Sequence, residues 1–277
     1  MRSAREITPE SDQERFVQGF DLVEIDAPNP TNFRRLQYMW RLRQTAGIIR
    51  RHVPAGSAIL EVGCASGNLS ITLAEAGFRI TSVDLQPGFV SYARKKDDRR
   101  LVRWMQGDAF ELGGGDRYAA IVMAEIIEHV TAPAELVRRA LALLSPGGLL
   151  VLTTPNGHAL LNSLPTFEQA RAATRGFAGI VIGPAGEDHI FAFTTREMER
   201  VIAEAGGVVV KRRYTGSLLL NTHVQWLLDI PVAGKVYFAA ARAVSAIPVI
   251  NRLVGPTLLL LVSPTGGEGP SHNTSNR

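Results

Sequence analysis

Two carboxylates and an imidazole lie within five residues of one another, at Glu125, Glu128 and His129. They follow the apolar run 118–124, whose composition predicts a buried strand. The three side chains would then stand at the carboxyl end of a strand, where open α/β sheets bind their ligands. An imidazole titrates near neutral pH, so His129 can accept a proton from a reacting group. The same residues also suit an ordinary helix start, because acids are favoured at that end of the helix dipole.

A second group, Glu61-Val62-Gly63-Cys64-Ala65-Ser66-Gly67, joins a short apolar strand to the start of a helix. Glycines at such a turn let the backbone approach a ligand closely. The spacing Gly-x-x-x-Gly differs from the Gly-x-Gly-x-x-Gly of dinucleotide sites, and the acid before it would repel a phosphate. An acid at this place suits a cation, which indicates a sulfonium ligand rather than a dinucleotide.

The motif formed by Glu61, Gly63, Cys64 and Gly67 resembles the first motif of class I S-adenosylmethionine (SAM)-dependent methyltransferases, with Ala65 in place of the usual middle glycine. The resemblance implies that this turn holds the methionine part of SAM. We do not expect Cys64 to act as a nucleophile, because no base pairs with it in the sequence pattern.

Further landmarks follow in the order of that family. The resemblance implies that Asp84, followed by Leu85 at the end of the second strand, accepts both ribose hydroxyls. It also implies that Asp108, followed by Ala109 after the third strand, reads the adenine amino group. Ser145-Pro146-Gly147-Gly148, before the fifth strand, is another landmark of the family.

Over about residues 32–262 the chain resembles the ubiquinone-biosynthesis type of O-methyltransferase. The segment Arg35-Leu36-Gln37-Tyr38-Met39 is similar to the Arg-Leu-x-Tyr-Ile helix that closes over SAM in that group. The resemblance implies that Arg35 and Tyr38 contact the cofactor. An ordinary helix face is the alternative.

The pattern Glu-x-x-Glu-His, followed sixty residues later by Asp188-His189-x-Phe191, also resembles the small-RNA 2′-O-methyltransferases. In that family two Glu and two His bind a divalent cation, which implies that Glu125, Glu128, His129 and His189 bind Mg²⁺, or alternatively Mn²⁺. A bound dication would lower the pKa of an acceptor hydroxyl, as it does for bound water. In the metal-free alternative, His129 or His189 takes the proton.

We therefore predict an O-methyltransferase that acts on a vicinal diol of a catechol-like, sugar or lipid-linked small molecule. RNA methylation is an alternative, but the chain has only four lysines, no basic patch with interleaved aromatic residues and no added RNA domain. A non-catalytic SAM-binding protein at a membrane is a third hypothesis. The sequence contains all four candidate metal ligands, which argues against a non-catalytic protein.

The elements that must position these residues alternate between strands and helices, which predicts an α/β, Rossmann-like fold. We expect a seven-stranded, mostly parallel sheet with helices on both faces and with helical cap insertions. Residues 1–30 are predicted to be an irregular arm and 31–264 the methyltransferase domain. Insertions at about 157–187 and 217–255 form the cap, and 265–277 is expected to be a disordered tail.

Composition and charge narrow the class further. The chain has 277 residues, 30 basic against 26 acidic, and one cysteine, which excludes a disulfide framework. Neither a secretory signal nor a long uncharged apolar segment is evident, so we expect a cytoplasmic protein. The segment 217–255 reads as two amphipathic helices that either extend the core or dock on a membrane surface. The sequence predicts no oligomeric state.

Overall fold

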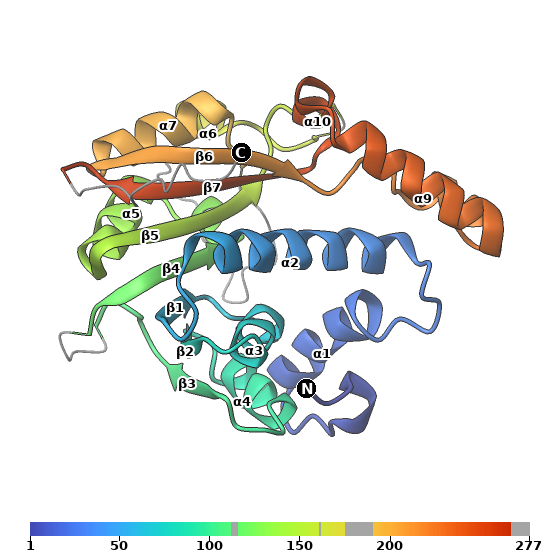
Figure 1. The fold of residues 1–277 in the computed structure, drawn as a ribbon, viewed down its shortest axis with the longest axis horizontal. Coiled ribbons are helices and arrows are strands. Elements are labelled where there is room, and N and C mark those ends of the chain that lie inside the picture. The colour runs from blue at the N-terminus through green and yellow to red at the C-terminus, as the bar shows by residue number, and fades with distance from the viewer. Residues whose placement is uncertain (112–115, 161, 175–190, 267–277) are drawn as a thin grey trace, which may run out of the picture.

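The computed structural model describes residues 1–111, 116–160, 162–174 and 191–266, and in these residues seven strands form one sheet. The strands are β1 (Ala58–Val62), β2 (Arg79–Asp84), β3 (Val102–Gln106), β4 (Tyr118–Ala124), β5 (Leu144–Pro155), β6 (Gly207–Thr215) and β7 (Thr257–Pro264). Their order is β3-β2-β1-β4-β5-β7-β6, and β7 runs antiparallel to both of its neighbours (Figure 1). The predicted mostly parallel, Rossmann-like sheet is thereby confirmed.

Helices cover both faces of this sheet. They are η1 (Ala4–Glu6), α1 (Asp12–Glu24), α2 (Phe33–His52), α3 (Asn68–Glu75), α4 (Pro87–Lys96), η2 (Ile127–His129), α5 (Pro133–Ala142), α6 (Phe167–Ala173), α7 (Thr195–Glu204), η3 (Thr222–Val224), α8 (Gln225–Leu228), α9 (Pro231–Ser245) and α10 (Pro248–Val254). Strand residues alternate between the two layers. In β4, Ala120 and Val122 pack towards α2 and α3, whereas Ile121 and Met123 pack towards α5 and α7. Burial on both faces explains why the strands read as continuous apolar runs.

The strand order reverses between β1 and β4, which both pair with their neighbours in parallel. In open α/β sheets such a switch point leaves a crevice at the carboxyl ends of the strands. The glycine-rich turn after β1 and Glu125 after β4 both lie at that crevice. The fold therefore brings together the two chemical motifs that the sequence keeps about sixty residues apart.

The N-terminal arm, predicted to be irregular, contains the helix α1, which packs on α4 and α2. Ser11 caps it by accepting a hydrogen bond from the Glu14 backbone amide. Its buried side chains include the acids Glu14 and Asp21, so it lacks the apolar periodicity that marks an ordinary helix. The prediction failed because polar contacts, which a hydropathy pattern does not reveal, hold this helix in place.

The cap differs in detail from the prediction. Segment 217–255 holds η3, α8, α9 and α10 rather than two helices, and α9 projects beyond the edge of the sheet (Figure 1). Segment 157–187 contains α6, while residues 161 and 175–190 lie outside the described residues. Residues 267–277 of the predicted tail lie outside them as well.

Candidate active site

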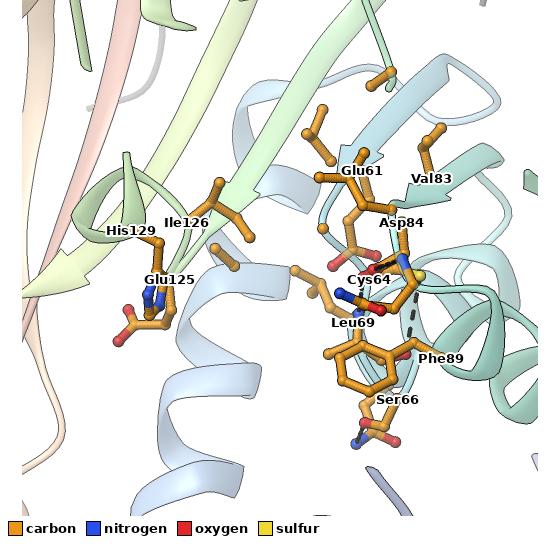
Figure 2. A pocket seen from close by; sticks show the side chains of 18 of the residues that line it. Glu61, Cys64, Ser66, Leu69, Val83, Asp84, Phe89, Glu125, Ile126 and His129 are labelled. Carbon is orange, nitrogen blue, oxygen red and sulfur yellow. Dashed lines mark hydrogen bonds between the residues drawn. The ribbon is translucent and has the colours of Figure 1, made fainter. Parts of the chain in front are cut away.

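A cavity of about 660 Å³, here called the first cavity, lies at the carboxyl ends of β1, β2 and β4. Among the predicted site residues, ten line it: Glu61, Gly63, Cys64, Asp84, Leu85, Asp108, Ala109, Tyr38, Glu125 and His129. Figure 2 shows Glu125 and His129 on one side of this cavity and Glu61, Cys64 and Asp84 on the other. The structure thus places most of the predicted cofactor residues around one space.

The glycine-rich turn owes its shape to two positions where a side chain does not fit. Gly63 has a φ of +73°, and a Cβ there would overlap the Ile126 side chain. Gly67 has a φ of +74° and is the N-cap of α3, and a Cβ there would lie 2.5 Å from Trp104 Cη2. Gly67 is not among the described residues that line the cavity, so it shapes the turn from behind. Ala65 has a φ of +45°, a left-handed conformation that glycine adopts more readily.

Two buried acids approach the turn from its inner side. Ser70 Oγ donates a hydrogen bond to Glu61 Oε2, and burial raises the pKa of Glu61 to about 7. Asp84 accepts hydrogen bonds from the backbone amides of Ala65 and Gln86, each at 2.9 Å. Burial also raises the pKa of Asp84, although these amides oppose the shift. A cationic ligand in the cavity would stabilise the ionised form of both groups. Burial likewise keeps the Cys64 thiol protonated by raising its pKa, which does not suit a nucleophile.

The far end of the cavity carries the predicted adenine-reading residue. Asp108 Oδ1 accepts a hydrogen bond from the Phe110 backbone amide at 2.9 Å, and Oδ2 lies 3.3 Å from Arg139 Nη2. The Arg139 guanidinium lies over the Phe110 ring, 4.7 Å from its centroid. Leu85, two-thirds exposed, and Ala109 complete this end of the lining. The sequence pattern indicated Asp108 but not Arg139 or Phe110.

Glu125 has a strained backbone and a cationic partner. Its φ is +57°, which is uncommon for a residue other than glycine. Thr153 Oγ1 donates a hydrogen bond to Glu125 Oε1 at 2.8 Å, and Arg41 Nη1 lies 3.2 Å from Oε2. Burial alone would lower the pKa of Arg41, but Glu125 and Glu24 outweigh burial and raise it. A guanidinium therefore pairs with one carboxylate oxygen of Glu125 and a hydroxyl with the other.

Glu128 points away from the cavity, into the protein. Its side chain is fully buried, Thr154 Oγ1 donates a hydrogen bond to it at 3.0 Å, and it is not among the described lining residues. Burial, followed by repulsion from Glu125, raises its pKa well above the ordinary value. His189 lies outside the described residues. Within the described part of the chain, no group of three or more His, Cys, Asp or Glu can hold a metal ion. The residues that can be placed do not fit the metal centre predicted from the sequence.

The arm and α2 cover the cavity. Phe16, Phe20 and Glu24 of α1 line it, together with Tyr38 and Arg41 of α2. Sequence reasoning missed all of these except Tyr38. The helical spacing of Tyr38 and Arg41, three residues apart on α2, was an available signal.

Arg35, predicted to contact the cofactor, is not among the described lining residues. Its Nε donates a hydrogen bond to the Ile25 carbonyl at 3.0 Å and its Nη1 to the Pro30 carbonyl at 3.2 Å. Arg35 thus fastens the end of the arm to α2. Tyr38, by contrast, accepts a hydrogen bond at its hydroxyl from Asn68 Nδ2 at 2.8 Å, which ties α2 to the glycine-rich turn.

A second cavity of about 440 Å³ adjoins the first. Four residues line both cavities: Glu24, Tyr38, Arg41 and Glu125. Its other walls come from α2, from residues between Pro155 and Leu164, from Leu218 in the segment 217–255 and from Thr257 at the start of β7. Burial raises the pKa of Glu24 to about 7, although the Arg41 charge opposes the shift. The two cavities can therefore hold two ligands that meet at a wall of ionisable groups.

Comparison with known proteins agrees with this geometry. A family model described as a methyltransferase domain matches residues 33–211. The ubiquinone biosynthesis O-methyltransferase of Xanthomonas axonopodis pv. citri (strain 306) is 37% identical over 110 residues, which cover 37% of this chain and 45% of that protein. The match therefore spans less than half the length of this curated relative.

Solved structures of similar fold include a putative sarcosine dimethylglycine methyltransferase from Galdieria sulphuraria, with a TM-score of 0.56 and 12% identity. That alignment covers 91% of this chain and 98% of the other. The CcbJ methyltransferase from Streptomyces caelestis has a TM-score of 0.53 at 15% identity, over 86% of this chain and 98% of the other. At such identities the likeness concerns the fold alone.

Proposed function

The chain belongs to the methyltransferase domain family and is a SAM-dependent methyltransferase, and we propose that it methylates a hydroxyl oxygen of a small molecule. The observation that carries the proposal is the wall of Glu24, Tyr38, Arg41 and Glu125 between the two cavities. We assign SAM to the first cavity, beside Glu61 and Asp84, and the acceptor to the second. The name of the curated relative, an O-methyltransferase, supports oxygen as the acceptor atom.

SAM supplies an electrophilic methyl group on a positively charged sulfur. The acceptor oxygen attacks the methyl carbon in line while the carbon–sulfur bond breaks and its electron pair stays on sulfur. The hydroxyl proton goes to an imidazole, which we assign to His129 because it lies beside Glu125, a residue of the wall between the two cavities. Much of the acceleration would come from holding both reactants aligned across the shared wall.

Arg41 supplies positive charge at the wall. Its guanidinium lies against Glu125, which Thr153 holds from the other side. Negative charge that develops on the acceptor oxygen would be stabilised by this fixed cation. A vicinal pair of oxygens, as in a catechol or a sugar diol, matches the planar fork of donors on Arg41.

Methyl transfer from SAM to a panel of catechols and glycosides tests the proposal, with and without EDTA. We expect transfer that survives EDTA and falls about a hundredfold or more in His129→Ala, the usual effect of removing a general base. Arg41→Gln should lower kcat with little change in the affinity for S-adenosylhomocysteine. Arg103→Gln is a matched control, because Arg103 is an exposed arginine paired with Asp116.

Several outcomes would contradict the proposal. Transfer abolished by EDTA and restored by Mg²⁺ would return the metal route through Glu125 and His189. Labelled methyl incorporated into short RNA duplexes, but into no small molecule, would replace the acceptor class. Transfer to nitrogen acceptors alone would refute the oxygen assignment.

A further inference from the structure

The segment 217–255, here called the C-terminal cap, carries large apolar side chains on its outer surface, in contact with solvent. Trp226 of α8 is 67% exposed, Val232 of α9 is 75% exposed and Val249 of α10 is 76% exposed. Val236, Ile247 and Leu253 add to the same stretch. Isolated exposed apolar residues are ordinary, but several of them on three successive helices indicate a binding surface. Figure 1 shows α9 extending beyond the sheet, so this surface is presented away from the core.

The apolar character of α9 is not explained by packing on the protein. Its inner side already packs through Tyr237, Phe238 and Ala241, and the Phe238 ring lies 5.9 Å from that of Trp40. The outer side repeats apolar residues at helical spacing, at Val232, Val236, Ala239 and Ala243, all exposed. A helix that is apolar on both sides is expected in a core or in lipid rather than in water.

The charge of this surface indicates what kind of partner it binds. From Gln225 to Val254 the chain has one acidic residue, Asp229, and three basic residues, Lys235, Arg242 and Arg252. All three are exposed. A second copy of the chain would bring two surfaces of net positive charge together, whereas an anionic lipid surface attracts such a surface. Apolar residues flanked by Lys and Arg are the composition of helices that lie in the membrane interface.

The lengths of the helices indicate that the C-terminal cap lies on a bilayer rather than crossing it. In the described part of the chain, no single helix is long and apolar enough to span a membrane. The helices α9 and α10 pass that test only together, and they are bent by 112° relative to one another. At 1.5 Å per residue α9 is about 22 Å long, shorter than a hydrocarbon core of about 30 Å.

We propose that the outer surface of α8, α9 and α10 docks on an anionic lipid bilayer. The methyltransferase domain family match ends at residue 211, so this surface lies beyond the part of the chain shared with that family. The surface also connects to the second cavity. The Leu160 backbone amide donates a hydrogen bond to the Leu253 carbonyl at 2.9 Å, and Asn156, which lines the cavity, donates from Nδ2 to the Arg252 carbonyl at 2.8 Å. Docking would therefore hold one wall of that cavity against the lipid surface.

Co-sedimentation of the full chain with vesicles tests the proposal, using phosphatidylcholine alone and a mixture of phosphatidylcholine with phosphatidylglycerol. Each basic residue near an anionic surface contributes about a fivefold change, so the triple variant Lys235→Gln, Arg242→Gln, Arg252→Gln should bind the mixed vesicles about a hundredfold more weakly. Added salt should weaken the binding of the natural chain. Val232→Glu with Val236→Glu should also abolish sedimentation.

The matched control is Val208→Glu with Val210→Glu, which places two acids at residues of β6 that are each 48% exposed. It should bind vesicles within about twofold of the natural chain, since surface changes elsewhere have small effects. Binding of S-adenosylhomocysteine reports that every variant is folded, so failure to dock is separable from failure of the active site. The proposal is overturned if the natural chain sediments with neither vesicle. It is also overturned if Val232→Glu with Val236→Glu instead splits a dimer on size-exclusion chromatography.

Discussion

Replacing Asp21 with alanine should release the N-terminal arm from the cofactor cavity. Asp21 is fully buried on α1, and Lys96 Nζ, on α4, donates a hydrogen bond to it. Tyr92 and Asn68 also donate to this carboxylate, at 2.9 and 2.7 Å. Asn68 lines the first cavity. One carboxylate therefore joins the arm, α4 and the glycine-rich turn.

The magnitude follows from the burial of the partner. Lys96 is 1% exposed, and removal of one member of a buried ion pair costs about 3–5 kcal/mol because the other charge stays buried. The protein can avoid this cost by undocking α1 or by releasing the Lys96 proton. Burial already lowers the pKa of Lys96, with Asp21 opposing the shift. Without Asp21 the neutral amine is favoured further, so the loss should be largest near pH 6–7 and smaller at pH 10.

The assay is trypsin cleavage after Arg15, which lies within α1, alongside calorimetric titration with S-adenosylhomocysteine. We expect cleavage to accelerate and the apparent Kd to rise, each by about tenfold or more, because ligand binding then has to restore the docked arm. Asp12→Ala is the control on the same helix, since Asp12 and Arg15 form an exposed pair worth less than about 1 kcal/mol. An Asp21→Ala protein that is folded, with cleavage and affinity unchanged at pH 7, would refute the reasoning.

Three further predictions concern the cofactor side of the cavity. Gly67→Ala adds a Cβ 2.5 Å from Trp104 Cη2 at a φ of +74°, and should cost about 2–5 kcal/mol in urea unfolding. Gly56→Ala, with a φ of +75° but open space around it, should cost only about 1–2 kcal/mol; equal losses would contradict the packing argument. Ala65→Gly removes left-handed strain at a φ of +45° and should raise the free energy of unfolding slightly, by no more than about 1 kcal/mol, as a small rise in the thermal midpoint would report; a marked loss of stability would show that the turn is not strained. The pKa of Glu61 is raised to about 7 in the folded, ligand-free protein from an ordinary value of 4.5, so its ionisation destabilises the fold as pH rises. Glu61→Gln should match the natural chain near pH 4.5 and be more stable by up to about 3 kcal/mol above pH 7; a difference that does not change with pH in urea unfolding would exclude this role.

The order of strands and helices could be predicted because the central strands β1, β4, β5 and β7 are largely buried on both faces. A run such as 118–124 must be apolar throughout to sit inside a parallel sheet, and this composition is visible without any structure. The turn after β1 could also be recognised from the sequence. Its glycines and its acid serve local geometry and a cationic ligand, so the motif indicated both the position of the cavity and the kind of ligand.

The contacts of the motif formed by Glu125, Glu128 and His129 could not be predicted in the same way. Glu125 and Glu128 are three residues apart, yet one lines the cavity and the other is buried behind it. The chain between them combines a left-handed backbone at Glu125 with the 3-10 helix η2, a geometry that no pattern of residue types reveals. Arg41, far away in sequence, forms an ion pair with Glu125, which the family resemblance had implied to be a metal ligand.

By itself, the sequence determined the alternating fold, the glycine-rich turn and the acids beside it, because these depend on local composition and on order along the chain. Only the tertiary structure decided that α1 is a helix covering the cavity, that Arg35 lies outside it and that four residues separate two cavities. Those features depend on contacts between segments distant in sequence, such as Lys96 with Asp21 and Arg41 with Glu125. Such contacts are set by packing and charge in three dimensions, which no local pattern records.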